Sequence, residues 1–186
     1  MKAYVALLRS INVSGHNIIK MADLKQLLSG ADLFDVHTYL QSGNVVFQSK
    51  IESTHELESL ISLLIKERYD YDVRVKVFSK TAFENSYNSN PFLKRPDLDL
   101  KMLYYIHLMG YPKQQDFDRI KKDPRFVEEM HLIDDTIYVH YSNGFGRSKL
   151  TGAAFEKNLE VSVTARNNNT MKNLCIKLEG ISTESA

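Results

Sequence analysis

Hydrophobic residues follow two different periods in alternating stretches of this chain. Runs in which every residue or every second residue is apolar predict β-strands, and runs in which apolar residues recur every three or four positions predict α-helices. In the first half these patterns predict strands at residues 3–8, 36–40, 45–48 and 73–78, and helices at residues 21–28, 57–65 and 83–87. The predicted order β-α-β-β-α-β-α is typical of a split βαβ unit, a four-stranded antiparallel sheet with two helices on one face.

Short local signals mark the ends of several predicted elements. Gly30 stands where a left-handed residue is expected to end the first helix. Ser53, followed three residues later by Glu56, is the signature of a capping box at the start of the second helix. Residues 42–44 (Ser-Gly-Asn) predict a hairpin turn between two strands. These signals agree with the boundaries that the hydrophobic pattern indicates.

The second half of the chain repeats this order of elements. Strands are predicted at residues 102–109, 126–133, 137–141 and 161–164, and helices around residues 117–120, 150–159 and 171–178. Ser148 is expected to begin the second of these helices, and Asn167 is expected to cap the third. No residue-level repeat accompanies the similarity, so the two halves are related only by their order of elements.

A break in the pattern separates the two halves. The stretch between residues 88 and 100 holds two of the four prolines and no hydrophobic periodicity, which is typical of a domain boundary. We therefore predict an α+β fold of two ferredoxin-like βαββαβ units packed together, each a split βαβ antiparallel sheet with its helices on one face. The first unit is expected in residues 1–90 and the second in residues 91–186.

Composition excludes several classes of protein. The chain has 186 residues, of which 43% are hydrophobic and 25% charged, as in globular proteins that bury a core. A formal net charge of +1 excludes binding to nucleic acid or membranes through bulk charge. Cys175 is the only cysteine, so an intramolecular disulfide and a cysteine-rich metal site are excluded. Because no apolar run could span a bilayer and no signal peptide is recognisable, we expect no membrane partner and a cytoplasmic location.

The longest predicted connection, residues 9–20 (RSINVSGHNIIK), is the first candidate for a functional segment. Its twelve residues exceed the roughly two to six that commonly join a strand to a helix. Its candidate ligand-binding residues are Arg9, Asn12, Ser14, Gly15, Asn17 and Lys20. Backbone N–H groups near a helix start, with a cation at each end of the loop, can hold a phosphate or a carboxylate. The alternative is a loop that packs apolar side chains against the other half of the chain.

A second polar segment, residues 39–45 (YLQSGNV), is expected beside the first. The first and third strands of a split βαβ sheet are commonly adjacent, which would bring the ends of these two segments together. Ser42 and Asn44 are its candidate ligand-binding residues. The alternative is that they serve only the hairpin turn.

A third polar segment, residues 164–170 (TARNNNT), precedes the last predicted helix. Its candidate ligand-binding residues are Arg166, Asn167 and Thr170. A cation at the electropositive start of a helix is unfavourable unless an anion compensates it. That anion is either an acidic side chain of the chain itself or a bound ligand.

Other arrangements that would indicate chemistry are absent from the sequence. The six histidines show no metal-ligand spacing and no GxSxG turn occurs, so no metal, cofactor or catalytic residue is predicted. The alternative of a single-stranded nucleic-acid binder rests on four aromatic residues that would form one base-stacking face: Tyr104, Tyr105, Tyr141 and Phe145. An RNA-binding signature is missing, and the basic surroundings are sparse.

The order of several motifs resembles a known family. The segments YVALLRSINVSG, KMADLKQLL, TYLQSGNVVF, NPF, SKL and TARNNNT look like the bacterial domain-of-unknown-function 1697 family. The resemblance runs from about residue 3 to residue 178 and implies a two-part α+β fold with ferredoxin-like halves, but no activity. Ser10 and Ser14 stand where the family pattern usually has glycine, and Asn168 stands where it usually has tryptophan.

These observations lead to three hypotheses about function. The first is a binding module for a small anionic ligand, nucleotide- or phosphate-like, held by the three polar segments. The second is a single-stranded nucleic-acid-binding protein, and the third is an enzyme whose reaction the residue spacing does not specify. The sequence makes no prediction about the oligomeric state.

Overall fold

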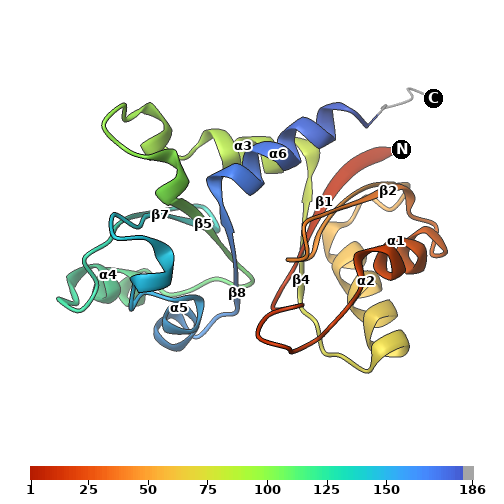
Figure 1. Cartoon of the computed structure of the whole chain (residues 1–186), viewed down its shortest axis with the longest axis horizontal. Helices are drawn as coiled ribbons and strands as arrows, with labels where there is room; N and C mark the ends of the chain where they lie inside the picture. Colours follow the sequence, from red (N-terminus) through yellow and green to blue (C-terminus); the bar gives the residue numbers. More distant parts are fainter. Residues whose placement is uncertain (182–186) are drawn as a thin grey trace. The chain divides into compact units, whose positions relative to one another are not determined.

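The computed structural model describes residues 1–181 and shows a mixed α/β chain with two four-stranded antiparallel sheets (Figure 1). The α+β class predicted from the sequence is confirmed at this level. The chain divides into two compact units: the first holds Met1–Asn85 and the chain from Asn173 onward, and the second holds Ser86–Lys172. The division at residue 90 that the sequence predicts remains a prediction.

In the first unit the strand order is β2-β3-β1-β4, so the first and third strands are neighbours. Its elements in chain order are β1 (Lys2–Leu8), α1 (Met21–Ser29), β2 (Phe34–Tyr39), β3 (Asn44–Ser49), α2 (Thr54–Tyr69) and β4 (Val75–Ser79). The chain passes between the two units within α3 (Lys80–Asn88) and within α6 (Asn168–Glu179).

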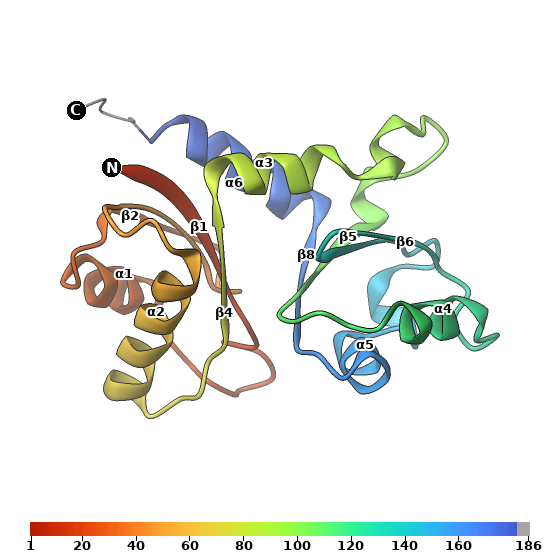
Figure 2. The same cartoon turned by 180° about the vertical axis from the view of Figure 1, so that it is seen from behind.

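Alternation along β1 directs side chains to the two faces of the first sheet. Tyr4, Ala6 and Leu8 are buried in one core with Leu24 of α1 and Ile61 of α2. Figure 2 shows these two helices on one face of the sheet. Leu8, the last residue of β1, lies in this core and its N–H donates to Gly43 O, so the loop that follows begins beside the turn between β2 and β3.

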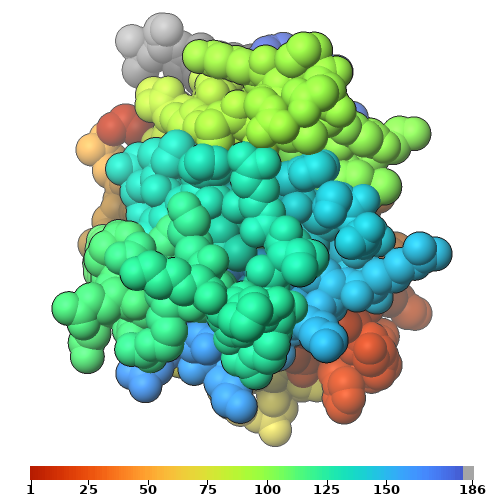
Figure 3. Space-filling model, turned by 90° about the vertical axis from the view of Figure 1, so that its left-hand side faces the viewer, coloured from red at the N-terminus to blue at the C-terminus, as the bar shows by residue number. Residues whose placement is uncertain are grey.

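In the second unit the strand order is β6-β7-β5-β8, which repeats the order of the first unit. Its strands and α-helices are β5 (Leu103–Leu108), α4 (Gln114–Lys122), β6 (Glu129–Ile133), β7 (Thr136–His140), α5 (Gly152–Leu159) and β8 (Val163–Asn167). It also has three short 3₁₀ helices: η1 (Pro91–Lys94), η2 (Leu100–Met102) and η3 (Phe145–Arg147). Residues 91–150, green to cyan, make up most of the surface seen in Figure 3.

Two helix boundaries differ from the sequence prediction. Gly30 ends α1 with a φ of −80°, so it is not left-handed; its N–H still bonds to carbonyls of the last turn. Ser148 does not begin α5, because Thr151 caps that helix by accepting a hydrogen bond from Ala154 N. The predicted cap at Ser53 is confirmed: its hydroxyl oxygen accepts a hydrogen bond from the backbone N–H at position 56 at 3.2 Å.

Candidate functional site

The loop between β1 and α1 is held together from inside by one asparagine. The Asn12 side chain donates through Nδ2 to Ile19 O at 2.9 Å and to Gln41 O at 2.8 Å, and its Oδ1 accepts from Ile19 N at 2.9 Å. A second amide, that of Asn17, donates through Nδ2 to Ser10 O at 3.2 Å. The Asn12–Gln41 bond brings together two of the three polar segments, the loop and the β2–β3 turn.

The backbone of this loop is repeatedly left-handed. Ser10, Asn12, Ser14 and Asn17 have φ values between 47° and 55°, and Gly15 has 81°. A left-handed residue with a Cβ costs roughly 1–2 kcal/mol, so this shape persists only because the surrounding contacts enforce it. Both serines stand at the positions where the family resemblance expects glycine, and their φ values explain that preference.

The outer surface of the loop and the start of α1 carry exposed polar groups. Ser14, Gly15 and Lys20 are exposed. Lys20 occupies the N-cap position of α1, and its side chain makes no capping hydrogen bond. The N–H groups of a helix's first turn lack intrahelical partners and carry partial positive charge, so this end of α1 favours an anion.

The β2–β3 turn fixes its own shape with a buried amide. Asn44 is fully buried, and its Nδ2 donates to Tyr39 O at 2.8 Å and to Ser42 Oγ at 3.0 Å. Gly43 has a φ of 74°, and its carbonyl accepts from Leu8 N at 2.8 Å. The hairpin predicted here is therefore present. Asn44 stabilises it from inside, and Ser42 is exposed.

The third polar segment belongs to the second unit. Arg166 on β8 is only 6% exposed, and its Nη1 donates to Thr164 Oγ1 and to Ala165 O, both at 2.8 Å. Burial lowers the pKa of Arg166 to about 10. The cap predicted at Asn167 is confirmed, because its Oδ1 accepts from Thr170 N at 2.8 Å. Whether these residues share a ligand with the loop after β1 stays a prediction.

The aromatic residues proposed for base stacking lie on both faces of the second sheet. Tyr104 stacks on Phe145 with ring centroids 4.6 Å apart, and Tyr141 meets both rings edge-on in the core below α4 and α5. Tyr105, the next residue on β5, points to the opposite face and donates its hydroxyl to Asn168 Oδ1 at 3.0 Å. These rings therefore do not form one stacking platform.

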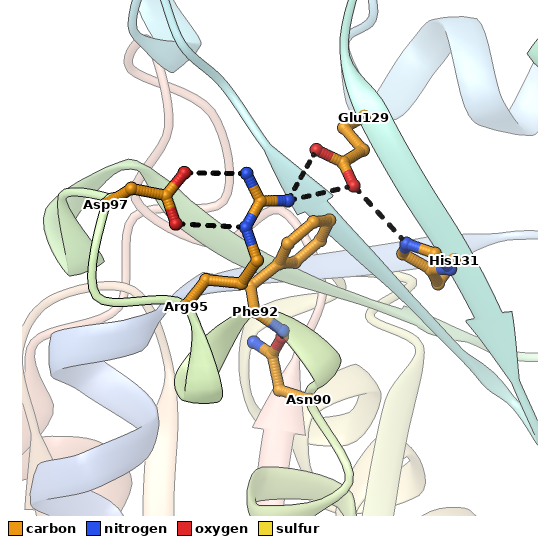
Figure 4. Close-up of polar contacts among 6 residues, drawn as sticks. All are labelled: Asn90, Phe92, Arg95, Asp97, Glu129 and His131. Carbon is orange, nitrogen blue, oxygen red and sulfur yellow. Dashed lines mark hydrogen bonds and ion pairs between the residues drawn. The ribbon is translucent and has the colours of Figure 1, made fainter.

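An ionic cluster in the second unit was not predicted from the sequence (Figure 4). The guanidinium of Arg95 pairs with both oxygens of Asp97, with distances of 3.1 and 2.7 Å, and with both oxygens of Glu129 at 3.3 and 3.2 Å. Hydrogen bonding to Asp97 raises the pKa of Arg95 and lowers that of the Asp97 carboxyl. The cluster ties the segment after η1 to β6. The Arg95–Glu129 contact spans 34 positions, too many for residue spacing to reveal.

Below this cluster lies the Asn-Pro-Phe motif. The ring of Phe92 meets His131 edge-on, with centroids 5.3 Å apart, and lies 6.1 Å from the ring of His140. Asn90 is buried and caps η1 by accepting from Phe92 N at 3.0 Å, whereas its Nδ2 has no hydrogen-bond partner in the described part of the chain. The motif therefore has a packing role that the sequence alone did not assign.

A second unpredicted polar pair lies in the first unit. Asp35 Oδ1 and His37 Nε2 of β2 are 2.6 Å apart. The available signal was the alternation of Asp35, His37 and Tyr39 along one strand. It was missed because the strand was predicted to begin at Val36, which left the aspartate outside it.

Two structural features are absent from residues 1–181. No helix there combines the length and the apolar character needed to cross a membrane. The same residues contain no group of three or more His, Cys, Asp or Glu side chains arranged to hold a metal ion. The cytoplasmic location expected from the sequence stays a prediction.

A protein family is similar to this chain over most of its length. The family model described as "Protein of unknown function (DUF1697)" matches residues 1–138. This match confirms the resemblance inferred from the sequence motifs, although the SKL and TARNNNT segments lie beyond it. A search of curated proteins gives no match.

A solved structure is similar to the whole fold. It is that of the conserved bacterial protein SP0830 from Streptococcus pneumoniae, with a TM-score of 0.75 and 24% sequence identity. The similarity covers 95% of this chain and 98% of that chain. At this level of identity the two chains share a fold, and nothing about activity follows from the likeness.

Proposed function

Because the chain belongs to the DUF1697 family, whose description assigns no activity, we propose a function from the geometry of the first unit: the loop between β1 and α1 binds a small anionic ligand, nucleotide- or phosphate-like in its chemistry. The observation that carries this proposal is the start of α1, where exposed Lys20 occupies the N-cap without capping the helix. A lysine there adds positive charge to an end that is already positive, so an anion stabilises it.

The shape of the loop supports the same proposal. Ser14 and Gly15 are exposed and left-handed, and successive N–H groups in such a turn can form a concavity that accepts an anion. The internal hydrogen bonds of Asn12 hold the loop, and His16 N donates to Val13 O at 2.9 Å across this turn, before any ligand arrives. A preorganised loop loses little conformational entropy on binding.

Exposed apolar residues in the loop and in the neighbouring turn indicate that the ligand also has an apolar part. Val13 and Ile18 are each 54% exposed, and Leu40 in the neighbouring turn is 52% exposed. The Asn12–Gln41 hydrogen bond places this turn next to the loop. A nucleotide, with a phosphate and a planar base, combines the two properties that this surface offers.

The remaining candidate residues have different relations to this proposed site. Arg9 is partly buried at the start of the loop, and its backbone N–H donates to Arg74 O at 2.9 Å. We propose that its guanidinium contributes positive charge to the site. For Arg166 and its neighbours on β8, a role in ligand binding also remains a proposal. The experiment described below tests only the loop.

The proposal is tested by calorimetric titration with inorganic phosphate, a nucleoside monophosphate and the unphosphorylated nucleoside. We expect saturable binding of the monophosphate and a loss of roughly tenfold in affinity in Lys20→Ala, the size typical of one charged contact. Lys25→Ala is the matched control, because Lys25 is exposed on the same helix but lies away from its N-terminus. Absence of binding at millimolar concentrations, or an equal loss in the control, would overturn the proposal.

We also propose that each sheet with its two helices is a ferredoxin-like unit. The support is that the orders β2-β3-β1-β4 and β6-β7-β5-β8 are equivalent, and that each sheet is built from a β-α-β-β-α-β run. On this proposal the chain contains two ferredoxin-like domains, with their boundary near residue 90.

A further inference from the structure

The edge strand of the first sheet contains an irregularity that changes the direction of one side chain. In the pairing of β2 with β3, Phe34 faces Gln48 and His37 faces Val46, so two residues of β2 lie opposite one residue of β3. The extra residue is Asp35, whose φ of 47° is left-handed. Such a β-bulge is often found next to a binding site, where it redirects a side chain.

The redirected side chain holds a histidine. Asp35 Oδ1 lies 2.6 Å from His37 Nε2. A carboxylate can only accept a hydrogen bond, so Nε2 donates, and in the neutral ring Nδ1 is then an acceptor. The pair therefore fixes both the orientation of the imidazole and its tautomer.

A lysine of α6 is held close to the same strand. Lys177 Nζ lies 5.4 Å from the centre of the Tyr39 ring, and Tyr39 follows His37 on the same face of β2. Leu174 and Leu178 of the same helix are buried. The contact with the Tyr39 ring places the ammonium group near the histidine.

Two of these residues, His37 and Lys177, line a small cavity. Its volume is about 230 Å³, and it is lined by His37, Lys177, Gly180 and Ile181. A cavity of this size suits a ligand smaller than the drug-sized molecules that occupy the usual range of about 300–1,000 Å³. The lining offers one ammonium group, one imidazole and the apolar surface of an isoleucine.

We propose that this cavity is a second binding site, distinct from the β1–α1 loop, and that it takes a small hydroxycarboxylate. The Lys177 ammonium pairs with the carboxylate, and the acceptor nitrogen of His37 receives the hydroxyl hydrogen. The Asp35 carboxylate, bonded to His37, adds negative charge beside the site, so a monoanion is favoured over a doubly charged phosphate.

The experiment is an NMR titration of the full chain with lactate, with propionate and inorganic phosphate as comparisons. We expect saturable shifts of the His37 ring signals with lactate, at least about fivefold weaker binding of propionate because it lacks the hydroxyl, and weaker binding of phosphate. Lys177→Ala is expected to weaken lactate binding by about tenfold or more, whereas Lys172→Ala, an exposed change on the same helix, leaves it unchanged.

Several outcomes would overturn the inference. One is the absence of a saturable shift with lactate at millimolar concentrations. Another is binding of propionate or phosphate that is as tight as binding of lactate. A third is an equal loss of lactate affinity in the two lysine variants. A His37→Ala variant supplies an independent check, since an exposed edge-strand position tolerates alanine, and unchanged lactate affinity in it would also count against the site. Lys20 does not line this cavity, so Lys20→Ala should leave lactate binding unchanged. The same variant tests the loop proposal, and the two proposals can therefore fail independently.

Discussion

The two units join their first strand to their first helix in very different ways. In the first unit β1 and α1 are connected by residues 9–20, twelve residues, and in the second unit β5 and α4 are connected by residues 109–113, only five. The strand order of the two sheets is nonetheless equivalent. A short connection is therefore enough to build this sheet, and the longer one in the first unit is not required by the topology.

The two connections also differ in their backbone. The longer loop contains five left-handed residues, including Ser10 and Ser14, and needs the internal hydrogen bonds of Asn12. The shorter one is held by an ordinary backbone hydrogen bond from Met109 N to Ser162 O at 2.8 Å. Two residues of this loop, Ile11 and Ile19, pack into the core of the first unit, and its added length and unfavourable backbone support the binding role proposed above.

The largest expected effect comes from Gly43→Ala, which tests how tightly the first unit holds its turn against the loop. Gly43 has a φ of 74°, and an added Cβ would lie 2.7 Å from Leu8 Cβ and 2.8 Å from Ile11 Cδ1. The left-handed strain and the overlap together should destabilise the protein by about 3 kcal/mol or more, as measured by urea unfolding.

The matched control for this change lies in the second unit. An added Cβ at Gly146 meets no atom within 4 Å, so Gly146→Ala should change the free energy of unfolding by less than about 0.5 kcal/mol. If the two substitutions changed the free energy of unfolding by similar amounts, the turn in the first unit would accommodate an added Cβ more easily than its contacts indicate.

Much of the fold could be predicted because its signals are local. The apolar run of residues 3–8, the stripe of residues 57–65 and the cap at Ser53 each depend on neighbours in the sequence, and the structure has a strand, a helix and a cap at these places. Gly30 shows the limit of this reasoning. Helix α1 ends there without a left-handed residue, whereas α2 ends at Asp70 with a φ of 56°, so the residue type alone did not decide the conformation.

The candidate site was harder to predict because its contacts are not local. The role of Asn12 depends on Gln41, which is 29 positions away, and the ionic cluster joins Arg95 to Glu129 across 34 positions. The burial of Arg166 likewise follows from packing around β8 and not from its neighbours in the sequence. Composition identified the polar segments, but the structure was needed to show which of their side chains are exposed and which are internal.

A smaller effect of opposite sign is expected from Ser10→Gly and Ser14→Gly, which sharpen the comparison between the two connections. Glycine removes the left-handed strain of roughly 1–2 kcal/mol but adds about 0.5–1 kcal/mol of unfolded-chain entropy, so each change should stabilise by about 0.5–1 kcal/mol. Urea unfolding checks this. Ser59→Gly within α2 should instead destabilise by about 0.5–1 kcal/mol; if all three changes had the same sign, the left-handed strain would not be the cause.

The smallest expected effect concerns the connection from the first helix of each unit to the next strand, and the contacts that stabilise it. In the first unit this connection contains left-handed Asp32, whereas in the second unit it is held by an ion pair between Asp123 and Arg125. Hydrogen bonding to the Arg125 side chain is the main cause that lowers the pKa of Asp123 from its ordinary 3.8 to about 2. The folded state therefore binds this proton less readily than the unfolded state does.

The sign of the pH dependence follows from this lowered pKa. The contribution of Asp123 to stability is present above about pH 4 and is lost as the pH falls through about 2. Arg125→Ala should raise the pKa of Asp123 toward 3.8 in a carboxyl NMR titration, while the backbone hydrogen bond from residue 125 keeps it somewhat below that value. Lys122→Ala removes the same charge without this contact and should leave the pKa nearly unchanged. An equal rise in both variants would show that general charge, and not the ion pair, lowers the pKa, and the second connection would then lack the ionic support that distinguishes it from the first.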